Sequence, residues 1–348
     1  MLAVWIGSRR MIDYAFDFIP EPGSARELDS GLHWLRMPLP IRLNHINLWV
    51  LADGDGWTVV DTGMYTDEAK EAWRALRQDL FATRPVQRVI CTHLHPDHVG
   101  CAGWLTREHD CDLWMTREEY MLCRLLVADT GREAPEEGIR FYRMAGFTDE
   151  ALQSYRNVFG FFGRYVSRLP EAYHRIEDDD IIEIGDRRWS VVIGKGHSPE
   201  HACLYDRDRN VLIAGDQLLP TISSNVGVYP TEPDANPLAR WFASLRRLKT
   251  ELDEDVLVLP AHGKPFKGAH ARLDALIQEH EEGLGKLLEL CSEPRRAVDV
   301  FPALFKSKVG PDNMIIATGE ALAHLHYLVD DGQLERFEDD GVYRFRRR

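Results

Sequence analysis

The sequence lacks the features that mark several large classes of protein. None of its hydrophobic runs approaches the roughly 18 apolar residues that a helix needs to span a membrane. Its formal net charge of -14 leaves no basic excess, which argues against electrostatic capture of nucleic acid over the whole surface. We therefore expect no membrane partner, and nucleic acid is a disfavoured partner.

Cysteine is also scarce, with six residues in 348 and no CxxC pair. Arg9 and Arg10 follow a short apolar start, whereas a secretory signal places its charges before a longer apolar region. We therefore expect reduced, mostly buried thiols and a cytoplasmic location. Cys91 stands two residues before His93, so it is either a buried strand residue, which we favour, or a neighbour of a metal site.

What the sequence does contain is a concentration of histidine and aspartate in the segment 92–100, THLHPDHVG. Imidazole and carboxylate groups are the usual ligands of zinc and its first-row neighbours. A regular helix or strand would not point His93, His95, Asp97 and His98 at one position. We therefore expect a tight loop that follows an apolar strand and holds metal ions.

Further aspartates and histidines stand where apolar strands are predicted to end. Asp-Gly turns within 53–56 predict a β-hairpin whose second strand ends in Asp61. His197, Asp216 and His262 each follow a later apolar run. In a layered α/β arrangement, the loops at such strand ends converge to form a site.

Two segments interrupt this alternation of strands and helices. Residues 117–175 are predicted to be helical and rich in aromatic side chains, which form either extra core or, as we favour, a lid with an apolar pocket. From residue 269, three helices and a hairpin follow in the order of a winged-helix module. We therefore expect a partly disordered extension at 1–20, a catalytic domain at 21–268 and a winged-helix-like C-terminal domain at 269–348.

Five separated motifs resemble those of the metallo-β-lactamase superfamily, in the same order. They are Asp61-Thr-Gly, the HxHxDH segment at 93–98, Gly196-His-Ser-Pro, Gly215-Asp and Pro260-Ala-His-Gly. The resemblance covers roughly residues 30–265. It implies an α+β fold, a four-layer αββα sandwich that carries 117–175 as a helical insertion, with a metal site at one edge of its sheets.

The resemblance also implies roles for individual residues. The metal ligands would be His93, His95 and His197 for one ion, Asp97, His98 and His262 for a second, and Asp216 between both. Asp61 would orient a ligand through a hydrogen bond. We expect His201 to be a hydrogen-bonded histidine beside the site. Two divalent ions are expected as cofactors, zinc first, with iron and manganese as alternatives.

The implied chemistry is hydrolysis by a hydroxide held between the two ions, with Asp97 and Asp216 as the catalytic carboxylates. The chain contains no G-x-S-x-G motif, which agrees with a nucleophile derived from water. True β-lactamases lack the bridging Asp216, so the chain is more similar to the glyoxalase II and lactonase side of the superfamily. We predict cleavage of a thioester, ester or lactone with an apolar acyl group.

Two other interpretations stay open at this point. The superfamily includes nucleic-acid phosphodiesterases, so an endoribonuclease-like activity is the alternative function. The C-terminal region is also a candidate docking element, including for a homodimer. It differs from the helical domain that binds glutathione in glyoxalase II, which argues against glutathione specificity.

Overall fold

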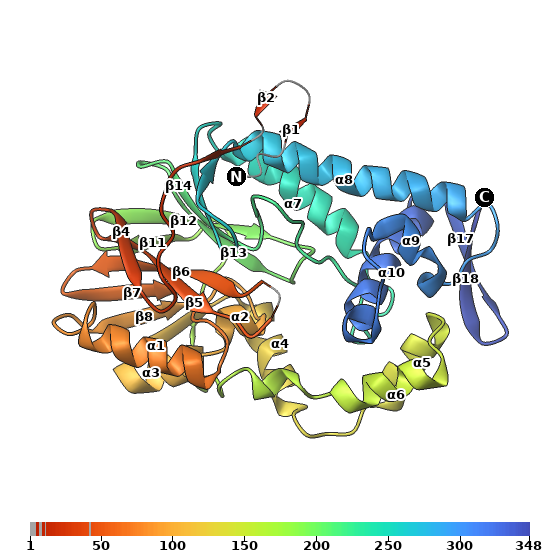
Figure 1. Cartoon of the computed structure of the whole chain (residues 1–348), viewed down its shortest axis with the longest axis horizontal. Coiled ribbons are helices and arrows are strands. Elements are labelled where there is room, and N and C mark those ends of the chain that lie inside the picture. The colour runs from red at the N-terminus through yellow and green to blue at the C-terminus, as the bar shows by residue number, and fades with distance from the viewer. Residues whose placement is uncertain (1–4, 7–8, 11, 42) are drawn as a thin grey trace.

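The computed structural model describes residues 5–6, 9–10, 12–41 and 43–348. Two seven-stranded sheets face each other, and helices cover their outer faces (Figure 1). The first sheet has the order β10 (His174–Arg175), β9 (Asp112–Met115), β8 (Val86–Ile90), β7 (Gly56–Val60), β6 (His45–Asp53), β5 (Leu32–Pro38) and β4 (Ala25–Asp29). The second has the order β11 (Ile181–Ile184), β12 (Arg187–Gly194), β13 (His201–Asp206), β14 (Val211–Gly215), β15 (Leu257–Pro260), β16 (Phe266–Lys267) and β3 (Asp13–Tyr14).

The core between the sheets is aliphatic and tryptophan-rich. Trp34 and Trp49 of the first sheet share one buried cluster with Trp189, Val191 and other residues of the second sheet. The central strands β7 and β14 are buried along their whole length, because each is covered by the facing sheet on one side and by helices on the other. This arrangement confirms the predicted α+β sandwich.

The helical layers complete the sandwich. The first sheet is covered by α1 (Asp67–Gln78), α3 (Ala102–His109) and α4 (Arg117–Ala128). The second sheet is covered by α7 (Pro237–Glu251) and α8 (Ala269–Leu290), and α10 (Met314–Asp330) packs against these two helices. Helix α1 shows why these segments are helical: Thr66 caps its start by accepting the N–H of Ala69, and Ala69, Trp73 and Leu76 recur on one buried face.

The insertion is helical as predicted, and it packs in two places. Its first helix, α4, places Tyr120 and Cys123 in the core of the first sheet. The next two, α5 (Glu136–Met144) and α6 (Asp149–Val158), lie apart from the sandwich, beside the C-terminal region (Figure 1). Tyr142 and Tyr155 form a separate cluster there, against which Met314 of α10 packs. A short 3-10 turn, η1 (Phe162–Arg164), leads back to the first sheet.

The C-terminal region contains the helices and hairpin predicted for it. After α8 come η2 (Ala297–Val300), α9 (Phe301–Leu304), η3 (Pro311–Asn313), α10 and the hairpin β17 (Leu334–Asp339) and β18 (Val342–Arg347). Its buried side chains share one hydrophobic cluster with α7 and the second sheet. The domain boundaries and the winged-helix likeness stay predictions.

The N-terminal segment reaches the second sheet. Strand β1 (Trp5–Ile6) pairs with β2 (Arg9–Arg10), and β3 pairs with β16 at the sheet edge. The sequence predicts that part of the segment 1–20 is disordered. Residues 1–4, 7–8 and 11 of this segment lie outside the described residues. Among the helices that the structure describes, none is both long and apolar enough to cross a membrane.

Candidate metal centre

The ends of five strands deliver the predicted site residues to one edge of the sandwich. In the first sheet, β7 leads into Asp61 and β8 into the segment 93–98. In the second sheet, β12 leads into His197, β14 into Asp216 and β15 into His262. Strands β7 and β8 are parallel neighbours, as are β14 and β15, so their carboxyl ends meet at the same edge.

The segment 93–98 is only partly the loop that the sequence predicts. Residues Pro96–Val99 form a short helix, α2, whose first position is proline, so Asp97 and His98 lie on a helical turn. His93 and His95 precede this turn and lie in non-helical backbone. The backbone changes from extended at His95 to helical at Pro96. Because of this change, four closely spaced side chains can face two neighbouring groups of ligand atoms, which a regular helix or strand would not allow.

Three histidines and an aspartate form the first group of converging side chains. His93, His95, His197 and Asp216 each place one nitrogen or oxygen within 4.8 Å of the corresponding atoms of the others. The His93 Nε2 atom lies 2.9 Å from His95 Nδ1 and 3.3 Å from His197 Nε2. Burial, followed by repulsion from His197, lowers the pKa of His95 to about 3, so this imidazole is neutral and has a lone pair for a metal ion.

The second group consists of Asp97, His98 and His262, whose ligand atoms also lie within 4.8 Å of one another. The His262 Nε2 atom lies 3.3 Å from an oxygen of Asp97. Burial alone would raise the pKa of Asp97, but the neighbouring His98 and His262 outweigh it and lower the pKa. The carboxylate is therefore ionised at neutral pH.

Asp216 faces both groups. Its Oδ2 atom lies 3.4 Å from His197 Nε2, and its Oδ1 atom lies 3.5 Å from His98 Nε2 and 3.5 Å from His262 Nε2. Although burial opposes ionisation, His262 and His98 lower the pKa of Asp216 well below its usual range. A single carboxylate can therefore present one oxygen to each group.

The donor set suits divalent cations. Within the described parts of the chain, the buried atoms His98 Nε2 and Asp216 Oδ1 have no hydrogen-bond partner, although both face the cluster. Among the described residues, no Lys or Arg forms an ion pair with Asp61, Asp97 or Asp216. Buried carboxylates are normally paired or bound to metal, so this negative charge calls for a cation. The structure thus supports a site for divalent metal, and the roles of individual ligands stay predictions.

Asp61 contacts His98, which is the kind of contact through which the resemblance implies that it orients a ligand. Its Oδ2 atom lies 2.8 Å from His98 Nδ1, which leaves the Nε2 atom directed at the cluster. The backbone N–H of Thr92 donates to Asp61 Oδ1 over 2.8 Å, and the Thr92 hydroxyl donates to Oδ2 over 2.8 Å. Asp61 therefore fixes the start of the histidine segment as well as one of its side chains.

His201 is the buried, hydrogen-bonded histidine that the sequence predicts. Its Nε2 atom accepts the backbone N–H of Asp216 over 3.0 Å, and its ring stacks on His93. It therefore positions the backbone that carries Asp216. Cys91 is buried, as the favoured interpretation expects, but it lies directly after β8, which ends at Ile90; burial raises the pKa of its thiol well above the usual value.

Glu119 is a site residue that the sequence reasoning missed. This buried carboxylate of α4 accepts the backbone N–H of Leu94 over 3.0 Å, the Ser198 hydroxyl over 2.6 Å and the backbone N–H of Glu200 over 2.8 Å. It thereby joins the loop that carries His93 and His95 to the loop that carries His197. Burial raises its pKa to about 7. One signal was available: Glu119 lies on the same helical face as the apolar Cys123.

Asn47 has a comparable role at His262. The Asn47 side-chain amide donates to the carbonyl oxygens of Pro260 over 2.9 Å and Gly263 over 2.8 Å. The indole N–H of Trp34 donates to the Oδ1 atom of Asn47. The His262 Nδ1 atom donates to the carbonyl of His45 over 3.0 Å. A fully buried asparagine on β6 therefore holds the loop of the second sheet against the first sheet.

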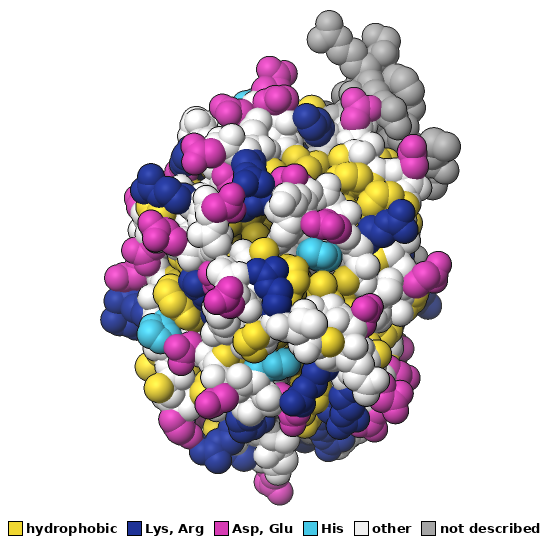
Figure 2. Space-filling model, turned by 90° about the vertical axis from the view of Figure 1, so that its left-hand side faces the viewer, with side chains coloured by type: hydrophobic (Ala, Val, Ile, Leu, Met, Phe, Trp, Pro, Cys, Tyr) yellow, Lys and Arg dark blue, Asp and Glu magenta, His cyan; other side chains and the backbone are white. Residues whose placement is uncertain are grey.

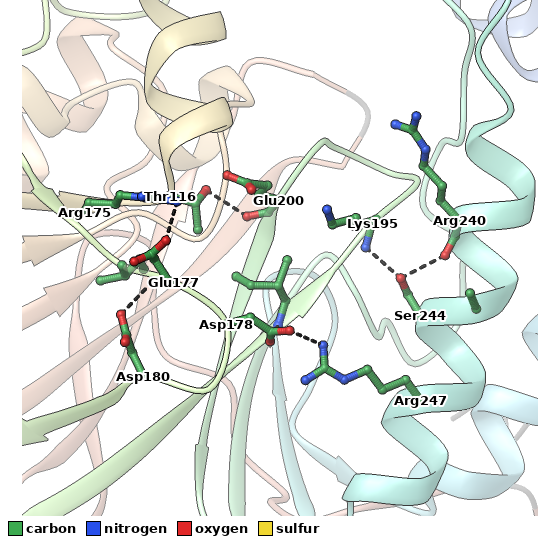
Figure 3. A pocket seen from close by; sticks show the side chains of 13 residues that line it. Thr116, Arg175, Glu177, Asp178, Asp180, Lys195, Glu200, Arg240, Ser244 and Arg247 are labelled. Carbon is green, nitrogen blue, oxygen red and sulfur yellow. Dashed lines mark hydrogen bonds and ion pairs between the residues drawn. The ribbon is translucent and has the colours of Figure 1, made fainter.

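A separate pocket of about 680 Å³ lies beside the His197 loop (Figure 3). Its lining includes Lys195 and Glu200, but among the described residues none of the seven cluster side chains. Four basic and four acidic side chains line it, and Arg247 pairs with Asp178 over 2.5 Å. The pocket is therefore charged but balanced in sign.

Comparisons with known families agree with the geometry. The family model for the metallo-beta-lactamase superfamily matches residues 41–262, which include all seven residues of the cluster. A second model, for the metallo-beta-lactamase-like C-terminal domain, matches residues 284–348.

Solved structures and curated relatives point the same way. A beta-lactamase domain protein from Burkholderia ambifaria is 39% identical, with a TM-score of 0.89, over 97% of this chain and 98% of that one. A metallo-beta-lactamase family protein from Thermus thermophilus is 28% identical, with a TM-score of 0.77, over 92% of this chain and 100% of that one. The bovine protein named acyl-coenzyme A thioesterase MBLAC2 is 26% identical over 55% of this chain and 64% of its own length.

Proposed function

Because the chain belongs to the metallo-β-lactamase superfamily, we propose that it is a binuclear metal-dependent hydrolase of thioesters, esters or lactones with an apolar acyl group. The observation that carries this proposal is Asp216, which presents one oxygen to each of two ligand groups. The names of two relatives support the thioester: the bovine acyl-coenzyme A thioesterase and a hydroxyacylglutathione hydrolase from Haemophilus influenzae, which is 20% identical over 60% of this chain and 82% of its own length.

The seven side chains of the cluster would hold two divalent ions. His93, His95 and His197 would hold one divalent ion, Asp97, His98 and His262 a second, and Asp216 both. When bound, two such ions supply an activated water and polarise the scissile carbonyl; zinc is the first expectation, with iron or manganese as alternatives. The ionised Asp97 carboxylate, beside His262, is placed to accept a proton released from water.

Apolar side chains on the elements that contact the site suit an apolar acyl group. Met121 and Leu125 of α4 are 55% and 50% exposed, and Ile316 of α10 is 51% exposed. Ile222 and Tyr229, on the loop after Asp216, are also exposed. A contiguous apolar patch in contact with water commonly marks a binding surface, and the proposal requires that these side chains form one. The insertion and α10 would then select the acyl chain, whose ester or thioester bond would lie at the metal centre.

The alternative, a nucleic-acid phosphodiesterase, has less support. On the face shown in Figure 2, Lys and Arg side chains lie among Asp and Glu rather than in a continuous stripe. Two of the four arginines of the C-terminal tail are also paired with carboxylates, Arg344 with Asp339 and Arg346 with Glu335. Nucleic-acid sites need unpaired positive charge along the backbone path.

A substrate panel tests the proposal. Metal-quantified protein is assayed on acyl thioesters, lactones and bis-p-nitrophenyl phosphate. We expect turnover of thioesters or lactones without turnover of the phosphodiester. Turnover of the phosphodiester alone would replace the proposed function by the alternative.

A chain-length series then tests the acyl selectivity. Leu125→Ser should lower kcat/KM for long acyl thioesters several-fold more than for short ones, because each lost methylene contact is worth about 0.8 kcal/mol. Ile181→Ser is the matched control, since Ile181 is 47% exposed but lies on β11 at the edge of the second sheet. An equal loss at every chain length would contradict acyl contact by α4.

A further inference from the structure

The loop 217–229, which directly follows Asp216, lies against the C-terminal helices. The guanidinium of Arg272, on α8, donates to the carbonyl oxygen of Leu219 over 2.8 Å and to that of Ile222 over 2.9 Å. Arg272 is only 1% exposed, so these are buried, charge-assisted contacts. The first half of the loop is therefore held by α8.

The second half of the loop makes contacts with both helices. The Ser223 hydroxyl lies 3.2 Å from Nε2 of His280, on α8. The backbone N–H of Val228 donates to the carbonyl of Gly319, on α10, over 3.0 Å. Helices that are remote from the histidine segment in sequence thus determine where this loop runs.

Asn225 connects that loop to the metal centre. His197 Nδ1 lies 2.7 Å from the carbonyl oxygen of Asn225, which can only accept, so Nδ1 carries the proton and Nε2 faces the cluster. The side chain of Asn225 is held on both sides: its amide donates to Glu320 Oε2 over 3.0 Å, and the Tyr229 hydroxyl donates to its oxygen over 2.9 Å. A chain of hydrogen bonds therefore runs from α10 to a predicted metal ligand.

We propose that Glu320 is a positioning residue of the metal centre, which acts through Asn225 to fix the tautomer and orientation of His197. The C-terminal region is then part of the catalytic apparatus, although it supplies no ligand. Without the carboxyl group, the Asn225 amide would lose its acceptor, its side chain would turn, and the carbonyl that orients His197 would move with it. This inference rests on the proposed metal-dependent function.

The acceptor, rather than the charge, is what the contact requires. Burial raises the pKa of Glu320 to about 7, so near neutral pH much of the population is uncharged. Glutamine has the same shape and keeps one oxygen that can accept from the Asn225 amide. Glu320→Gln should therefore retain the positioning contact, and Glu320→Ala should lose it.

The experiment measures zinc affinity by chelator competition and the His197 tautomer by ¹⁵N NMR of the metal-free protein. We expect Glu320→Ala to weaken zinc binding about tenfold and to lose the Nδ1-protonated signal, while Glu320→Gln stays within about twofold of wild type. The matched control is Glu338→Ala, since Glu338 is an exposed glutamate of the same region. Wild-type affinity and tautomer in Glu320→Ala would overturn the proposal.

A second variant covers the case in which Glu320→Ala does not fold. Asn225→Ala removes the intermediate side chain and should reproduce the loss in zinc affinity. The double variant should then lose no more than either single change, because both interrupt one path. Additive losses would overturn the proposal. A wild-type protein that binds zinc but cleaves no substrate would contradict the proposed function instead, and the affinity comparison would still decide the role of Glu320.

Discussion

The two sheets contribute to the candidate metal centre in different ways. The first sheet delivers four of the seven side chains in one short segment, 93–98, directly after β8. The second sheet delivers His197, Asp216 and His262 from three loops that are far apart in the sequence. A compact motif positions itself largely through its own backbone, whereas dispersed side chains depend on contacts with other elements.

The supports of the two halves differ accordingly. On the first sheet, Asp61 lies next to the histidine segment and belongs to the neighbouring strand end. On the second sheet, the loops are held by Asn47 of the first sheet, by Glu119 of the insertion and by the C-terminal helices through Asn225. The insertion and the C-terminal region therefore both contact the loops that carry the second half of the site.

The largest effect should come from the residue that joins the two halves. Asp216→Asn replaces a carboxylate that faces both groups by an amide, whose nitrogen is a poor ligand. We expect occupancy to fall to one metal ion or fewer per chain and turnover to fall by more than about 100-fold. Metal analysis and steady-state kinetics measure both. Two ions per chain with unchanged turnover would refute the bridging role.

A smaller loss should follow from separating the two loops that Glu119 joins. Glu119→Gln leaves one oxygen for three donors, and its amide would oppose the N–H of Leu94. We expect metal affinity to fall about 10- to 100-fold, as measured by chelator competition. Glu118→Gln is the control on the same helix, because Glu118 is exposed. An equal effect in both variants would show that the hydrogen bonds of Glu119 to the two loops do not support metal binding.

The smallest effect concerns Glu320 in the C-terminal region and the pH dependence of the free energy of unfolding. Burial raises the pKa of Glu320 from its ordinary 4.5 to about 7, so the folded protein holds this proton more tightly than the unfolded chain does. Its contribution to the free energy of unfolding is complete below pH 4.5 and is lost as the pH rises through about 7. Relative to Glu320→Gln, wild type should lose about 1–3 kcal/mol over this range.

Urea unfolding of both proteins at several pH values, with metal held constant, provides the measurement. The isosteric glutamine removes the titration while keeping the acceptor, so the difference between the two proteins isolates one group. A difference that does not change with pH would mean that the carboxyl group is not buried as the structure has it.

The sequence was most informative where local spacing determines geometry. The strand-end positions of the histidines and aspartates predicted that these side chains converge on one site, and the resemblance implied the sandwich. The helical turn at Pro96–Val99 was not anticipated, because the histidine spacing alone suggested a loop. Proline at its first position was the available signal.

Contacts between remote elements could not be predicted. Glu119 and Glu320 lie on helices that pack beside the site only in the folded chain, and no sequence spacing links them to His197. Each is nevertheless a carboxylate on a largely apolar helical face, which is an unusual place for a charge. The sequence predicted that the aromatic residues of the insertion form one lid, whereas the structure places them in two clusters. Tyr120 lies in the core of the first sheet, and Tyr142 packs near the C-terminal region.

The most direct test of the account is the metal content of the protein, measured in the same sample as its hydrolysis of acyl thioesters. We predict two divalent ions per chain, loss of hydrolysis when a chelator removes them, and recovery when zinc, iron or manganese is restored. Full hydrolysis by chelated, metal-free protein would contradict the account, and so would a fully active protein that binds only one ion.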